Sequence, residues 1–88
     1  MPHVAFTPQL RRFLAVPEVY SQAATLRAAL EDAFAQSPNL RGYVLDDQDH
    51  LRANVAVFID GRRCKDPTLA DPLQPDSRVY VLQALSGG

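Results

Sequence analysis

Cysteine and glycine are scarce in this chain, and each scarcity is informative. The 88 residues hold one cysteine, Cys64, which excludes an internal disulfide and a four-cysteine zinc or iron–sulfur site. Without disulfides the default compartment is a reducing one, so we predict a cytoplasmic protein. Only four glycines occur, and two of them are the final residues, Gly87 and Gly88. At ordinary glycine usage of about 7%, a terminal pair is a rare coincidence.

The chain also lacks an excess of charge and a long hydrophobic run. Its formal net charge is −1 and its pI about 6.0. Nucleic acid is therefore not expected as the main partner, because phosphate binding requires a basic face. The apolar runs are far too short to span a bilayer, and the amino terminus shows no secretory pattern, so no membrane partner is expected. With 47% hydrophobic residues, the sequence fits one globular domain.

The first half of the sequence predicts two strands and one helix. Residues 3–6 alternate as a strand, and residues 10–16 are able to return as a second strand after a turn. Thr25 is a good helix N-cap, with Ser21 as a rival one turn earlier. Pro38 predicts the end of the helix and a loop over residues 37–42. One stripe of the helix is apolar at the spacing of a buried face: Leu26, Leu30, Ala33 and Phe34.

The second half predicts a hairpin and a final strand. Residues 53–59 are rich in β-branched and aromatic side chains, and Asp60-Gly61 is a strong two-residue turn signal before a short return strand over 62–64. An irregular, proline-rich stretch leads to the last strand, residues 78–82. The predicted fold class is therefore α+β, with one helix packed across a mixed four- to five-stranded sheet. We expect residues 1–83 to form the domain and residues 84–88 to form a flexible tail.

This order of elements, with a glycine pair just after the last strand, resembles the ubiquitin-like β-grasp fold. It resembles more closely the MoaD/ThiS family of small sulfur-carrier proteins. The resemblance covers nearly the whole chain, and the terminal strand with Gly87-Gly88 is its most specific part. A longer segment between the helix and the third strand departs from the shortest, thiazole-type carriers. The matching stretches are Val4-Ala5-Phe6, Leu10-Arg11-Arg12-Phe13, Ala24-Thr25-Leu26, Asn54-Val55-Ala56-Val57-Phe58-Ile59-Asp60-Gly61, Asp76-Ser77-Arg78-Val79-Tyr80-Val81 and Leu85-Ser86-Gly87-Gly88.

The resemblance implies a carrier and not an enzyme. In such proteins a ubiquitin-activating-type enzyme adenylates the terminal carboxylate, here that of Gly88, with its own ATP and magnesium. A persulfide donor or sulfurtransferase then supplies sulfur, and the resulting thiocarboxylate serves a sulfur-accepting synthase in molybdopterin, thiamine or other biosynthesis. The chain itself binds no cofactor or metal in this reading, although it is a possible small subunit of a synthase such as molybdopterin synthase. The alternatives are a ubiquitin-like modifier joined to lysines through Gly88 and a plain β-grasp interaction module.

The tail and one sheet face are the predicted sites. The five residues 84–88 extend about 16 Å, which is enough to place Gly88 inside a partner protein. Gly87 lets the backbone pass through a narrow slot of the partner where a Cβ would collide. Leu85 is expected to anchor the threaded segment, and the small Ser86 follows it. In a β-grasp fold the first and last strands are neighbours, so a docking patch is predicted on their outward residues: Ala5, Thr7, Tyr80 and Leu82.

The remaining candidates for chemistry have simpler interpretations. Cys64 lacks a partner at catalytic spacing and is interpreted as a buried or edge thiol. His3 and His50 are isolated. The acidic run over 46–49 lacks the glycine and closing glutamate of a calcium loop and predicts a solvated turn. Two basic groups predict edge protection or a rim for an acidic partner: Arg11-Arg12 and Arg62-Arg63-Lys65.

Overall fold

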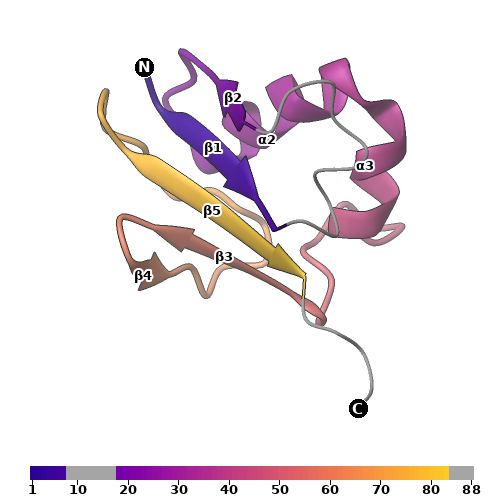
Figure 1. Ribbon diagram of the computed structural model, residues 1–88. Coiled ribbons are helices and arrows are strands. Elements are labelled where there is room, and N and C mark those ends of the chain that lie inside the picture. Colours follow the sequence, from indigo (N-terminus) through magenta and orange to yellow (C-terminus); the bar gives the residue numbers. More distant parts are fainter. Residues whose placement is uncertain (8–17, 84–88) are drawn as a thin grey trace.

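The computed structural model describes residues 1–7 and 18–83 of the chain. Within these residues it holds five strands and two helices, shown in Figure 1. In chain order they are β1 (His3–Phe6), β2 (Glu18–Tyr20), α2 (Leu26–Gln36), α3 (Pro38–Val44), β3 (Val55–Ile59), β4 (Arg62–Arg63) and β5 (Arg78–Gln83).

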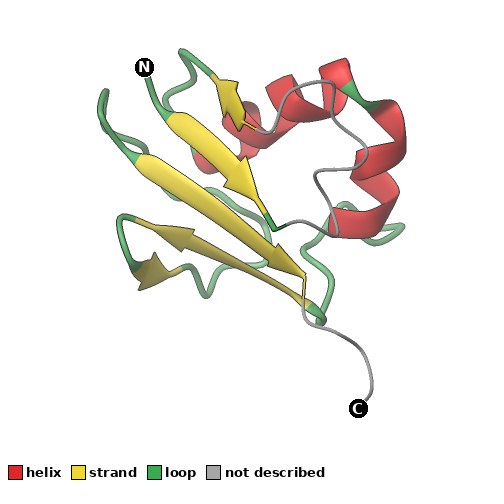
Figure 2. Cartoon of the chain, in the orientation of Figure 1, coloured by secondary structure: helices red, strands yellow, loops and turns green. Residues whose placement is uncertain are grey.

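The strands form one mixed sheet in the order β2-β1-β5-β3-β4. The first and last strands, β1 and β5, pair in parallel at its centre, and every other neighbouring pair is antiparallel. Both helices lie on one side of the sheet, and no helix of residues 1–7 and 18–83 lies on the other face (Figure 2). The predicted α+β class, the five-stranded mixed sheet and the pairing of the first strand with the last are confirmed.

The hairpin between β3 and β4 has the turn that the sequence predicts. Asp60 and Gly61 both take positive φ values, 50° and 84°, as a two-residue hairpin turn requires. The Asp60 carboxylate also accepts a hydrogen bond from the backbone N–H of Arg78 at 2.9 Å. The turn therefore holds the start of β5 in register with β3.

Helix α2 is capped and buried as predicted. The Thr25 hydroxyl accepts a hydrogen bond from the backbone N–H of Ala28 at 3.2 Å, so Thr25 is the N-cap. Ser21 is not the cap: its hydroxyl donates to the Asp32 carboxylate at 2.5 Å instead. Every residue of the predicted apolar stripe is buried.

The predicted loop over residues 37–42 is wrong, because a second helix, α3, begins at Pro38. Ser37 leaves the helical region, with φ −143° and ψ 89°, and the chain then restarts as a helix. Proline is well suited to a first helical position, since its missing N–H has no partner there anyway. The helix buries Leu40 and Val44 against the core. The single helix expected from the sequence is therefore a pair, and α3 fills the longer segment noted before the third strand.

The strand boundaries differ from the predicted ones at several ends. The predicted return strand over 10–16 lies outside the described residues, and the strand that pairs antiparallel with β1 is β2. Strand β3 begins at Val55, two residues later than predicted, because residues 53–54 form a turn. Strand β4 excludes Cys64, and β5 extends one residue further, to Gln83.

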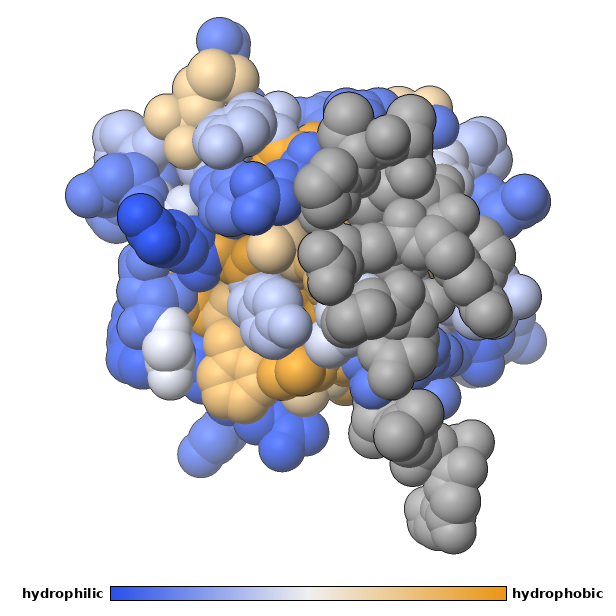
Figure 3. Space-filling model, in the orientation of Figure 1, coloured by the Kyte–Doolittle hydropathy of each residue, from blue (hydrophilic) through white to orange (hydrophobic). Residues whose placement is uncertain are grey.

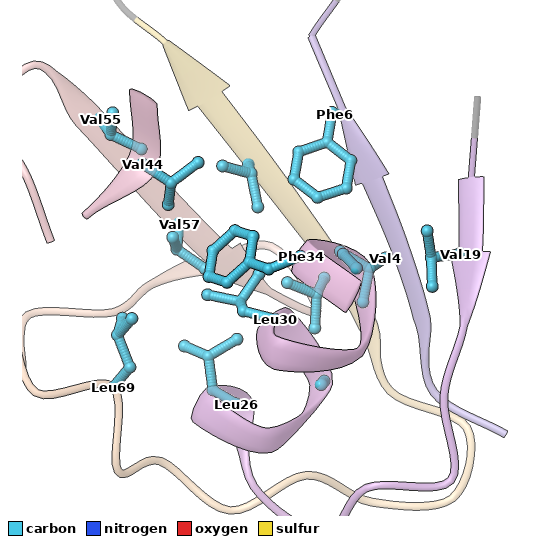
Figure 4. Close-up of a cluster of buried hydrophobic side chains, with 14 of the residues drawn as sticks. Val4, Phe6, Val19, Leu26, Leu30, Phe34, Val44, Val55, Val57 and Leu69 are labelled. Atoms are coloured by element: carbon cyan, nitrogen blue, oxygen red, sulfur yellow. The ribbon is translucent and has the colours of Figure 1, made fainter. Parts of the chain in front are cut away.

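The hydrophobic core lies between the helices and the inner face of the sheet. Figure 4 shows Leu26, Leu30 and Phe34 of α2 directed towards the strands. The buried residues of β5, Val79 and Val81, complete this layer. Among the described residues, neither helix has the length and apolar character needed to cross a membrane. The core therefore fixes β5 at the centre of the sheet, directly before the tail.

Candidate functional site

An apolar patch occupies the sheet face opposite the two helices. Cross-strand register places Tyr80 of β5 between Ala5 of β1 and Phe58 of β3, and places Leu82 beside Ala56. The Tyr80 side chain is 41% exposed. Figure 3 shows apolar colours gathered near the centre of this face, with hydrophilic residues along the left and lower edges. The five residues called the outer patch below are Ala5, Ala56, Phe58, Tyr80 and Leu82. A patch of this kind is a typical protein interaction surface.

The structure brings together three of the four residues predicted to dock a partner. Ala5, Tyr80 and Leu82 belong to the outer patch. Thr7 differs, because it is only 6% exposed and offers a partner little surface. Its hydroxyl instead accepts a hydrogen bond from the backbone N–H of Gln83 at 3.3 Å. Thr7 therefore holds the last described residue of the chain, and a docking role for the other three stays a prediction.

Two patch residues, Ala56 and Phe58, were not predicted as part of the site. Their alternation with buried Val55, Val57 and Ile59 places them on the outward face of β3. That pattern was visible in the sequence. The pairing of β3 with β5 was not, and this pairing brings Phe58 next to Tyr80.

Charged groups lie on opposite sides of the outer patch. Arg63 of β4 pairs with Phe58, so a guanidinium group borders the β4 side, whereas Arg78 lies at the start of the central strand β5, opposite His3. Glu18 of β2 pairs with Ala5 on the other side and lies 2.8 Å from Nε2 of His3. The face is therefore apolar at its centre, basic towards β4 and acidic towards β2.

The predicted reactive tail lies outside the described residues. This holds for Leu85, Ser86, Gly87 and Gly88, whose predicted roles stay predictions. The structure does place the root of the tail, because Gln83 ends β5 opposite Val55 of β3. Tyr80 and Leu82 thus lie on the strand that leads directly into the tail.

Cys64 occupies a buried position after β4. It is 8% exposed, and its backbone N–H donates to the carbonyl oxygen of Val57 at 2.8 Å. Burial raises the pKa of the Cys64 thiol above its ordinary value. Because the thiolate is the nucleophilic form, this environment favours an unreactive thiol, as the sequence predicts.

We expect iodoacetamide to alkylate Cys64 at least about tenfold more slowly in the folded protein than in urea at neutral pH. A raised pKa leaves less thiolate at pH 7, so the rate in the folded protein should still increase above about pH 10, where an ordinary thiol (pKa about 8.5) is almost fully ionised. Mass spectrometry of timed samples measures both rates. Equal rates in the two states contradict the buried placement.

The acidic run is a solvated turn, as predicted. The Asp46 carboxylate accepts hydrogen bonds from the backbone N–H groups of Gln48 and His50, at 2.9 and 3.0 Å. These donors lower the pKa of Asp46. No cluster of three His, Cys, Asp or Glu side chains able to hold a metal occurs in the described part of the chain. The Asp46 carboxylate therefore stabilises the turn that follows helix α3 and precedes strand β3.

Several solved structures share this fold over the whole chain. A chain of the BexX/CysO complex of Amycolatopsis orientalis has a TM-score of 0.84 and 16% identity, with 100% of both chains covered. CysO of Mycobacterium tuberculosis has a TM-score of 0.83 and 19% identity, and the match covers 97% of this chain and 100% of that one. SAMP1 of Haloferax volcanii has a TM-score of 0.81 and 19% identity, and the match covers 99% of this chain and 98% of that one. No protein-family model and no curated protein matches the sequence.

The comparisons confirm the β-grasp, ubiquitin-like fold and the structural resemblance to small proteins of this type. Identities of 16–19% establish the fold alone. A function for this chain therefore has to be argued from the chemistry of its own residues.

Proposed function

We propose that this chain is a small sulfur carrier whose Gly88 carboxylate is adenylated by a partner enzyme and converted to a thiocarboxylate. One observation carries the proposal: the central strand β5 of a ubiquitin-like sheet continues directly into five residues that end in Gly87-Gly88. Glycine lets the backbone enter a narrow slot, and the terminal carboxylate has no side chain beside it. The folded body then serves to bind partners and is not catalytic.

The proposed chemistry needs an activating partner, because a carboxylate is a poor electrophile. A Gly88 oxygen attacks the α-phosphate of ATP, pyrophosphate leaves, and an acyl-adenylate forms. Magnesium on the partner stabilises the phosphate charge. The terminal sulfur of a persulfide then attacks the carbonyl carbon and expels AMP. A thiol cleaves the resulting acyl disulfide, which leaves the thiocarboxylate and a disulfide.

The outer patch is proposed as the surface that the adenylating enzyme binds. Tyr80 and Leu82 lie on β5, one to three residues before Gln83. When a partner binds Tyr80 and Leu82, the start of the tail is held at a fixed position relative to the partner's surface. Aromatic residues at the centre of such surfaces contribute most to binding. The sulfur-accepting synthase, whether for molybdopterin, thiamine or another product, needs the same tail and is expected to bind the same face.

Intact mass measurement of the protein from its native cells tests the proposal. A thiocarboxylate has one sulfur in place of one oxygen, and fragmentation should place that exchange on Gly88. Deletion of Gly87 and Gly88 should abolish delivery of sulfur to the product. Sulfur delivery by the shortened chain contradicts the proposal.

A second candidate is a ubiquitin-like modifier, which uses the same activation but ends in an isopeptide bond to a lysine. The similarity to SAMP1 favours it, since SAMP1 of Methanosarcina acetivorans is named a small archaeal modifier protein. A modifier produces conjugates of higher mass in cells, and deletion of Gly88 removes them. A plain interaction module, in contrast, binds its partner normally without the glycine pair.

A further inference from the structure

The chain is nearly free of lysine. It has eight arginines but a single lysine, Lys65. Under the proposed function Gly88 becomes an activated acyl group, and primary amines are the side chains that such a group acylates to give a stable amide. Apart from the α-amino group of Met1, Lys65 is the one amine on the molecule. Its position relative to the tail therefore decides whether the activated chain is able to react with itself.

Lys65 lies at the end of the sheet where the tail begins. The hydrogen bond from the Cys64 N–H to the Val57 carbonyl oxygen puts Lys65 level with the start of β3. There, Val55 pairs with Gln83, the root of the tail. Val55 and Lys65 also line the same open cavity, of about 390 Å³. Strands β4 and β5 are separated only by β3.

The tail is long enough to cover this separation. Two strand spacings, from β5 to β4, amount to about 10 Å. The five residues after Gln83 span up to about 16 Å when extended. The carbonyl carbon of Gly88 is therefore within reach of the Lys65 amine of the same molecule.

The surroundings of Lys65 suit an anionic acyl phosphate. Lys65 is exposed, and Arg52 and Arg63 line the same cavity. Asp66 also lines it, but its carboxylate accepts hydrogen bonds from the N–H and the hydroxyl of Thr68, at 2.9 and 2.6 Å. Basic groups thus border the amine, and the neighbouring carboxylate is engaged by Thr68.

We propose that Lys65 is an intramolecular acceptor for the chain's own activated carboxyl terminus. The Nζ lone pair attacks the carbonyl carbon of Gly88, and a carbon–nitrogen bond forms. The bond to the leaving group breaks, AMP departs with the electron pair, and the nitrogen releases a proton to water. Tethering gives the amine an effective concentration of about millimolar. The product is a cyclic isopeptide without a free carboxylate, so a chain that has cyclised is no longer able to accept sulfur at Gly88.

The test uses a full-length chain carrying a Gly88 α-thioester, made by intein cleavage with a small thiol, so that no partner enzyme is needed. We expect a product lighter by one water than the hydrolysed chain, at a rate independent of protein concentration. Trypsin should yield a branched peptide, residues 64–78 with residues 79–88 attached at Lys65. Lys65→Arg keeps the charge and should abolish this product, leaving hydrolysis.

A relocated lysine provides the control. Ser21 N–H donates to the Pro2 carbonyl oxygen, and His3 pairs with Arg78, so the exposed Gln22 lies beyond the opposite end of the sheet. It lies about seven residues along the strands and two strands across from Gln83, about 25 Å in all, whereas the extended tail and a lysine side chain together reach roughly 22 Å. Lys65→Arg combined with Gln22→Lys should therefore not cyclise.

The inference is overturned by cyclisation of Lys65→Arg, by cyclisation of the double variant, by branching at Met1, or by covalent dimers alone. Hydrolysis without cyclisation also overturns it, but leaves the proposed function intact if native Gly88 carries sulfur. The absence of sulfur on native Gly88 removes the proposed function, whatever the thioester does.

Discussion

Replacing Gly87 with valine should lower the rate of thiocarboxylate formation on Gly88 by at least about 100-fold, because displacing a reacting atom by about 1 Å costs this much. Valine adds a branched side chain where the backbone is proposed to pass through a narrow slot, and it restricts the backbone to fewer conformations. The carboxylate oxygen of Gly88 then misses the position from which it attacks the α-phosphate of ATP. The adenylating enzyme, ATP, a persulfide donor and intact mass measurement provide the assay.

Gly42→Ala is the matched control for this result. Gly42 lies in α3, and a Cβ added there meets nothing within 4 Å. Activation should be unchanged, and stability should rise by about 0.5–1 kcal/mol because alanine is a better helix former. Normal thiocarboxylation of Gly87→Val contradicts the steric role of the glycine pair.

Local patterns predicted the elements whose periodicity is strong. The alternation of residues 55–59 and the Asp60-Gly61 turn predicted the central hairpin, and the apolar stripe after Thr25 predicted α2. In these places the local preference and the tertiary structure agree. The same agreement made the outward positions of Tyr80 and Leu82 predictable.

Helix α3 shows why a local pattern is not always sufficient. Ser37, Pro38 and Gly42 all favour a loop when considered alone. Burial of Leu40 and Val44 against the core favours a helix, and proline is tolerated in its first turn. Tertiary packing therefore prevails over local preference here.

The residues that make up the candidate site could be predicted only with knowledge of the strand order. Phe58 joins the outer patch, and Lys65 lies near the root of the tail, only because β3 is inserted between β5 and β4. The burial of Thr7 was likewise not predictable, because it depends on the hydrogen bond between its hydroxyl and the Gln83 N–H. Pairings between distant strands are not encoded in the alternation of a single strand.

The second large effect is expected at the centre of the outer patch. Tyr80→Asp should weaken binding of the adenylating enzyme by about 30-fold or more, the loss of about 2 kcal/mol typical of a central aromatic anchor. The introduced carboxylate also loses its hydration where the partner covers it, which adds to the cost. Because Tyr80 is 41% exposed, the fold should tolerate the change. Titration calorimetry with the purified enzyme measures the dissociation constant.

Tyr43→Asp provides a control matched in residue type and exposure. Tyr43 is also 41% exposed but belongs to α3, on the side of the sheet where the helices lie. Its replacement should leave the dissociation constant unchanged. The two classes of variant should also separate kinetically: Tyr80→Asp raises KM for the carrier, since docking is lost, whereas Gly87→Val lowers turnover while the carrier still binds. Equal loss of binding in Tyr80→Asp and Tyr43→Asp contradicts docking through the outer patch, because only one of these tyrosines lies on it.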